Sequence, residues 1–137
     1  MLNYAVGYLA ASLTFVAADM VWLGTMAPRF YRPTMGDIAI AGVSLPPAIL
    51  FYAIYPIGLL IFAINPALKN GSLITAACYG ALFGFFTYAT YDLTNHATLR
   101  NWTLPLTVVD IAWGTVLAAL TSIAGFLAVS KLMAAAG

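Results

Sequence analysis

Residues 104–132 read LPLTVVDIAWGTVLAALTSIAGFLAVSKL, an almost unbroken apolar stretch with one carboxylate, Asp110, near its start. About 20 mostly apolar residues in a helix are enough to cross the hydrocarbon core of a bilayer. Three further stretches of the same character precede it, at about 4–26, 45–64 and 72–95. We therefore predict an all-α integral membrane protein with four transmembrane helices in an antiparallel bundle.

The composition also indicates a membrane domain. Of the 137 residues, 64% are hydrophobic and 7% are charged, whereas soluble domains carry about 25% charged residues. This length allows one domain, so we predict a single four-helix transmembrane domain over residues 1–137. A formal net charge of +1 argues against nucleic acid as a partner. The single cysteine, Cys78, excludes an intrachain disulfide and is interpreted as a small core residue.

Four spans place both termini on one side of the membrane, here called side A, together with a turn at 65–71. The other side, side B, carries the segment 27–44 and the connection 96–103. Proline disfavours a helical conformation in the residue before it, so Ala27-Pro28 is predicted to end the first span. The segment 27–44 then forms a short interfacial segment, as a surface helix or an extended strip. Cytoplasmic loops carry an excess of Lys and Arg. Side B carries three of these side chains and side A carries two, which favours side B as cytoplasmic but leaves the orientation open.

Three of the four acidic residues lie within the spans, and the topology places all three in the half of the membrane near side B. Asp19 and Asp92 are near the ends of the first and third spans, and Asp110 is near the start of the fourth. At 1.5 Å per residue, Asp19 and Asp110 lie roughly 10 Å below the surface of side B. A charge at the bilayer centre costs roughly 2.5–3.5 kcal/mol on insertion scales. None of the three should face lipid, so we predict that they line a shared polar pocket.

Two of these carboxylates have the same sequence context. Asp19 belongs to DMVWLGT and Asp110 to DIAWGT, so a tryptophan, Trp22 or Trp113, follows each of them three residues later. Residues three apart share a helix face, and an indole is therefore expected beside each carboxylate. The alternative is a structural role, in which the acids join helices through hydrogen bonds from Thr, Tyr or Trp side chains.

The stretch YATYDLTNHATLRNW, residues 88–102, contains the remaining candidates. Tyr88, Asp92 and His96 recur at every fourth position, so Asp92 can accept a charge-assisted hydrogen bond from His96 or one from Tyr88. Alternatively, Asp92 and His96 only mark the end of a helix at the lipid headgroups. The candidate ligand-binding residues derived in this way are Asp19, Trp22, Tyr88, Tyr91, Asp92, Asn95, Asp110 and Trp113.

Catalysis and metal binding are weakly supported alternatives for the same residues. Asp92 and His96 could act as an acid–base pair, and Asp19, Asp92, His96 and Asp110 are the weak candidates for metal ligands. No known catalytic motif and no paired-histidine metal motif is present in the sequence. We therefore assign no catalytic residue and no metal site, and any cofactor stays open.

Packing residues are indicated in two of the spans. Ala76, Gly80 and Gly84 recur at four-residue spacing in the third span, and small residues let helices approach closely in lipid. The partner of this face is either another span or a second chain, as a homo-oligomer or a partner membrane subunit. Tyr52 and Tyr55 in the second span are interpreted as core residues, with the wall of the pocket as the alternative.

The combined motifs resemble a known family. YDLTN-x-ATL-x-x-W from Tyr91 to Trp102, T-x-VDIAWGT from Thr107 to Thr115 and the early D-x-x-WLG from Asp19 to Gly24 are similar to the bacterial membrane proteins catalogued as domain of unknown function 2177. The resemblance covers essentially the whole chain and implies a four-helix protein of the bacterial inner membrane, without implying a reaction. The matching positions are Asp19, Trp22, Tyr91, Asp92, Thr94, Asn95, Asp110 and Trp113. They add Thr94 to the candidate ligand-binding residues, whereas the position of His96 is open in the motif.

Three functions are consistent with these observations. The leading hypothesis is that the pocket near side B binds or transports a small polar or amphipathic molecule, with a lipid among the candidates. The second is an accessory subunit of a larger membrane complex that docks through the Gly80 and Gly84 face. The third is a membrane-embedded enzyme that acts on a lipid or isoprenoid substrate through Asp92 and His96. Membrane lipids surround the protein in all three.

Overall fold

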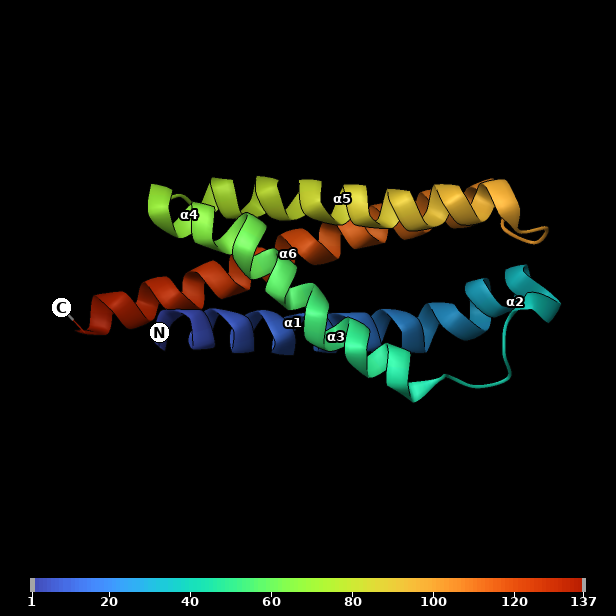
Figure 1. The fold of residues 1–137 in the computed structure, drawn as a ribbon, viewed down its shortest axis with the longest axis horizontal. Coiled ribbons are helices and arrows are strands. Elements are labelled where there is room, and N and C mark those ends of the chain that lie inside the picture. The colour runs from blue at the N-terminus through green and yellow to red at the C-terminus, as the bar shows by residue number, and fades with distance from the viewer. Residues whose placement is uncertain (1, 137) are drawn as a thin grey trace.

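The computed structural model describes residues 2–136 and consists of helices, of which α1 (Leu2–Met26), α5 (Leu73–Thr98) and α6 (Leu104–Ala136) run along the long axis of the molecule (Figure 1). Four helical segments within these residues are long and apolar enough to cross a membrane, namely Leu2–Ile38, Leu45–Asn70, Leu73–Thr98 and Leu104–Ala136. This confirms the predicted all-α fold with four transmembrane helices. The first segment begins, and the last one ends, at the same end of the molecule, which is side A.

The first span remains helical beyond its proline. Helix α1 (Leu2–Met26) ends directly before Ala27-Pro28, but the chain continues through a π-helical turn, Ala27–Tyr31, and helix α2 (Arg32–Met35). Proline lacks an N–H group, and its ring clashes with the carbonyl one helical turn earlier. The wider π-helical turn is a known way to accommodate such a local disruption within a helix. The interfacial segment is therefore largely helical.

The second span also contains a π-helical turn between two α-helices. Helix α3 (Leu45–Leu59) passes through a second π-helical turn, Leu60–Ile64, into helix α4 (Asn65–Asn70). The connection to α5 is consequently much tighter than the turn expected over 65–71. Gly71 adopts a left-handed conformation with φ of +59°, which glycine accommodates without strain.

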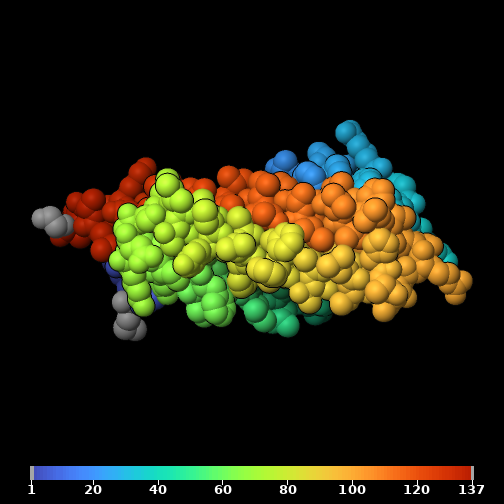
Figure 2. Space-filling view, turned by 90° about the horizontal axis from the view of Figure 1, so that it is seen from above, coloured from blue at the N-terminus to red at the C-terminus, as the bar shows by residue number. Residues whose placement is uncertain are grey.

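Helices α5 (Leu73–Thr98) and α6 (Leu104–Ala136) lie side by side along the molecule (Figure 2). Small residues allow this close approach, because a Cβ atom at Gly80 would come within 2.7 Å of the Ala118 carbonyl oxygen. Ala76, Gly80 and Gly84 are all buried, and Gly84 contacts Gly114. The small-residue face is thus covered by α6 of the same chain, and association with a second chain through it stays a prediction.

Helix α3 crosses the bundle obliquely (Figure 1). Near side A, its continuation α4 packs against α5, whereas near side B α3 packs against α1. The fully buried ring of Phe15 in α1 fixes the second contact, with ring centroids 5.9 Å from Tyr52 and 4.8 Å from Tyr55. Helices α3 and α5 therefore diverge toward side B.

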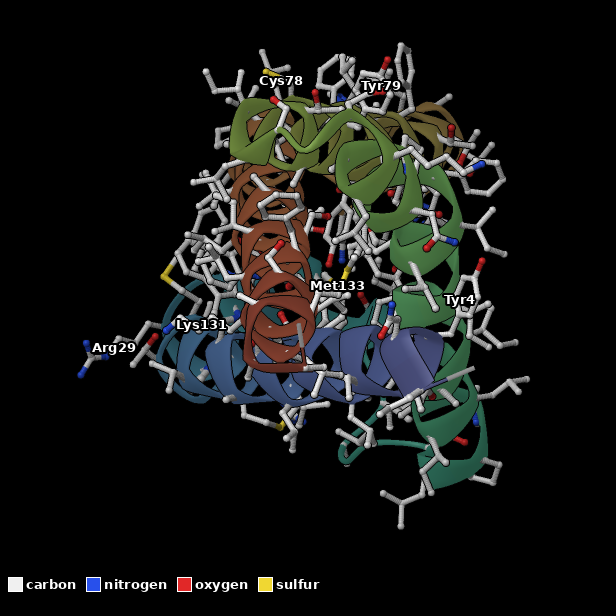
Figure 3. The ribbon with its side chains drawn as sticks, turned by 90° about the vertical axis from the view of Figure 1, so that its left-hand side faces the viewer. Tyr4, Arg29, Cys78, Tyr79, Lys131 and Met133 are labelled. Atoms are coloured by element: carbon white, nitrogen blue, oxygen red, sulfur yellow. The ribbon has the colours of Figure 1, made fainter. Side chains whose placement is uncertain are left out.

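Seen from side A, apolar side chains also point away from the bundle (Figure 3). Cys78 and Tyr79 lie on the outer face of α5, and Cys78 is exposed. The interpretation of Cys78 as a core residue is therefore wrong. The cause is helical geometry: residues two apart do not face the same way, and Ala76 and Gly80 point toward α6.

Candidate functional site

Asp19 is buried in α1, with 5% of its surface exposed, and is bound by two other helices. The hydroxyl of Tyr52 in α3 donates to Oδ2 at 2.6 Å, and the indole N–H of Trp113 in α6 donates to Oδ1 at 3.0 Å. Both donors are neutral groups. Asp19 therefore joins three helices through hydrogen bonds from partners that carry no positive charge.

Asp110 of α6 is bound by the segment that follows α1. The hydroxyl of Tyr31, in the π-helical turn, donates to Oδ1 of Asp110 at 2.5 Å and accepts a hydrogen bond from the Trp22 indole at 3.0 Å. The carboxyl group of Asp92 lies on another side of Asp110 and contacts it. Tyr31 was not predicted as a site residue, because an aromatic side chain beside Arg29 and Arg32 is typical of any membrane interface.

The two Asp-x-x-Trp motifs are interlocked. Each indole was expected beside the carboxylate of its own helix, but Trp113 binds Asp19 of the other helix, and Trp22 reaches Asp110 through Tyr31. The two indoles stack on each other with centroids 4.3 Å apart and planes 4° from parallel. Because α1 and α6 are antiparallel, each indole lies level with the carboxylate of the opposite helix.

Asp92 of α5 is fully buried, and neither of its carboxyl oxygens has a hydrogen-bond partner. Its carboxyl group lies beside that of Asp110 and near the Trp102 indole. The Trp102 N–H is likewise buried without a partner. Burying a polar group without a hydrogen bond costs free energy. Asp92 and Trp102 therefore carry the unpaired buried polar atoms of the site.

Three other candidates on α5, Thr94, Asn95 and His96, line neither of the two cavities that meet at the carboxylates. His96 was predicted to reach Asp92, but its Nδ1 pairs with the hydroxyl of Thr107 at 3.1 Å. Thr94 is exposed and donates to the carbonyl oxygen of Thr90, in its own helix, at 2.6 Å. Asn95 is half-buried.

The candidate metal ligands do not form a coordination site. Among residues 2–136, no three His, Cys, Asp or Glu side chains are close enough together to hold a metal ion. Asp19, Asp92, His96 and Asp110 are instead distributed over three helices. Asp19 and Asp110 accept from different donors, and His96 pairs with Thr107.

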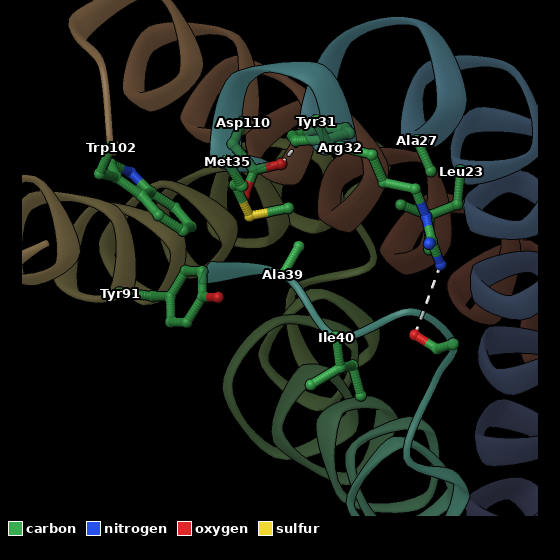
Figure 4. A pocket seen from close by; sticks show the side chains of 11 residues that line it. Leu23, Ala27, Tyr31, Arg32, Met35, Ala39, Ile40, Tyr91, Trp102 and Asp110 are labelled. Carbon is green, nitrogen blue, oxygen red and sulfur yellow. Dashed lines mark hydrogen bonds between the residues drawn. The ribbon is translucent and has the colours of Figure 1, made fainter. Parts of the chain in front are cut away.

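Two cavities meet at the carboxylates. The inner cavity has a volume of about 450 Å³ and is lined by Asp19, Leu23, Phe51, Tyr55, Thr87, Tyr88, Tyr91, Asp110 and Trp113. The outer cavity, of about 340 Å³, lies beneath the interfacial segment (Figure 4). Leu23, Tyr91 and Asp110 line both cavities. Asp110 therefore stands at the boundary between the bundle interior and the interface.

The outer cavity is covered by a fixed loop. The Arg32 guanidinium donates hydrogen bonds to the carbonyl oxygens of Ala41 at 2.9 Å and Gly42 at 3.4 Å, the second of which is drawn in Figure 4. Arg32 is the only basic residue among those that line the two cavities. Its hydrogen bonds go to the loop, and the donors to Asp19 and Asp110 are neutral groups.

Comparison with protein families matched residues 4–127 to the family described as "Predicted membrane protein (DUF2177)". The chain belongs to this family. The DUF2177 match includes Asp19, Asp92 and Asp110 together with both Asp-x-x-Trp motifs, and it agrees with the resemblance seen in the sequence. Comparison with curated proteins gave no match, and neither did comparison with solved structures.

Proposed function

We propose that this protein binds a small polar or amphipathic molecule, with lipids among the candidates, in the two cavities near side B, and carries or presents it within the bacterial inner membrane. The observation that supports this proposal is the position of Asp110. It borders both cavities, and Tyr31 occupies only one of its two carboxylate oxygens. A ligand in either cavity would therefore lie against the carboxyl group of Asp110.

A purely structural role accounts for one carboxylate but not for the others. Each oxygen of Asp19 has a donor from another helix, as expected of a residue that joins helices. Asp92 is fully buried with no partner for either oxygen, and Asp110 is only partly bound. Polar groups in a membrane interior are expensive and mark functional sites by default. Asp110 lines both cavities and Asp92 lines neither, which favours Asp110 as the group that contacts a ligand.

The other two functions have less support from the contacts. An acid–base mechanism requires Asp92 and His96 to act together, yet His96 pairs with Thr107 and lines neither cavity. Docking of a partner subunit through Gly80 and Gly84 would use a face that α6 already covers. Ligand binding needs no rearrangement of either kind.

Native mass spectrometry of the gently solubilised protein tests the proposal. The wild-type protein should retain a small molecule that Asp110→Asn loses. Asp37→Asn makes the same change of charge at an exposed residue outside both cavities, and it should retain the molecule. An adduct that is identical in all three proteins, or absent from the wild type, would refute ligand binding at this site.

A further inference from the structure

The charge and shape of the inner cavity indicate the class of its ligand. We infer that the cavity takes an amphipathic organic cation, whose charged group lies between Asp19 and Asp110 and whose apolar part extends between α3 and α5 into the membrane. This inference rests on the proposed binding function and specifies its substrate class.

The inner cavity holds two carboxyl groups and no basic residue. The donors to Asp19 and Asp110 are the hydroxyls of Tyr52 and Tyr31 and the indole of Trp113. A buried carboxylate needs hydrogen bonds, a proton or a nearby cation. A cationic ligand supplies the charge that the protein does not, whereas an anionic ligand would be repelled by both groups.

Aromatic rings form most of the remaining wall. Phe51, Tyr55, Tyr88, Tyr91 and Trp113 all line the inner cavity. The rings of Tyr55 and Tyr88 are nearly perpendicular, with centroids 6.3 Å apart and planes at 89°, so they form two adjacent sides of the cavity. Faces of aromatic rings attract a cation that lies within about 6 Å of the ring centre. Carboxylates and aromatic faces together make a binding site for organic cations.

Two exposed side chains border the inner cavity. Phe51 of α3 is 39% exposed and Tyr91 of α5 is 56% exposed, and these residues line the cavity from the two helices that diverge toward side B. An amphipathic cation at the membrane interface can therefore enter sideways between α3 and α5. The volume of the inner cavity, about 450 Å³, falls within the range of small-molecule pockets.

The sign of the ligand charge can be tested with two ions of the same shape. Tetraphenylphosphonium is a cation, and tetraphenylborate is an anion with the same four phenyl groups. The full-length protein in lipid nanodiscs should bind tetraphenylphosphonium saturably in equilibrium dialysis. Tetraphenylborate should bind no more than it binds to empty nanodiscs.

Variants connect this binding to the cavity. Asp110→Asn keeps an oxygen that accepts from Tyr31, and it should weaken phosphonium binding by about 30-fold or more. Asp110→Glu restores the charge and should recover most of the binding, whereas the exposed control Asp37→Asn should change it by less than about twofold. Tyr91→Phe keeps an aromatic face and should bind normally, but Tyr91→Leu should bind about tenfold more weakly.

The possible outcomes separate this inference from the proposed function. Equal binding of both ions, or full binding by Asp110→Asn, would overturn the organic-cation assignment. A neutral or anionic adduct that depends on Asp110 in native mass spectrometry, without phosphonium binding, would overturn this inference and leave the proposed function intact. The absence of any Asp110-dependent adduct and of phosphonium binding would overturn both.

Discussion

Replacing Gly114 by alanine tests the contact that shapes the inner cavity. A Cβ atom at this position would meet Cγ, Cδ1 and Cδ2 of the Tyr88 ring, far inside the 3.4–4 Å of ordinary van der Waals contact. The ring must withdraw from α6 or the two helices must separate. Overpacking of this kind costs about 1–3 kcal/mol. Because Tyr88 lines the inner cavity, its displacement should also weaken the binding of any ligand there.

Gly24→Ala is the control, because Gly24 lies two residues after the tryptophan of the first Asp-x-x-Trp motif and Gly114 directly follows that of the second. A Cβ atom at Gly24 would have no atom within 4 Å, so this variant should be as stable as the wild type or more stable by up to about 1 kcal/mol. The free energy of unfolding can be measured by titration with sodium dodecyl sulfate in mixed micelles. Equal stability of Gly114→Ala and Gly24→Ala would show that Tyr88 does not lie against α6.

Three further substitutions test the hydrogen bonds around the carboxylates. Tyr31→Phe removes the donor to Asp110 and should lower the free energy of unfolding by about 1.5–3 kcal/mol; a loss below about 0.5 kcal/mol, the low end for a hydrogen bond, would contradict the contact. Trp113→Phe keeps an aromatic ring for stacking but leaves Oδ1 of Asp19 unpaired, so it should destabilise the protein by about 1–3 kcal/mol, as measured in the same titration. His96→Ala should cost about 1 kcal/mol and leave ligand retention in native mass spectrometry unchanged, whereas loss of the ligand would revive the pairing of His96 with Asp92.

The number of spans and the common location of the carboxylates could be predicted from the sequence. Hydrophobic length determines how often a chain crosses a bilayer, and counting the crossings places Asp19, Asp92 and Asp110 in one half of the membrane. Neither step depends on how the helices are rotated about their axes. Both follow from chain connectivity and from the exclusion of polar groups from lipid.

The pairing of donors with carboxylates could not be predicted in this way. Which residue binds Asp19 depends on the rotation of α6 and the tilt of α3, and both are set by packing, through Gly84 against Gly114 and Phe15 against the tyrosines of α3. The role of Tyr31 depends on the chain remaining helical beyond Pro28. The general rule for proline indicates a helix end there, and a π-helical turn replaces that end.

The interlocked motifs have a consequence for the order in which the protein is made. Asp19 obtains its donors from Tyr52 and Trp113, which follow it by 33 and 94 residues. At a synthesis rate of about 5–20 residues per second, the first span waits roughly 5–20 s in the membrane before its second donor exists. A chain that stops before the fourth span leaves Asp19 incompletely bonded and the Trp22 indole without its stacking partner. Asp19 and Trp22 therefore obtain their full set of contacts only after α6 has been made and has packed against α1.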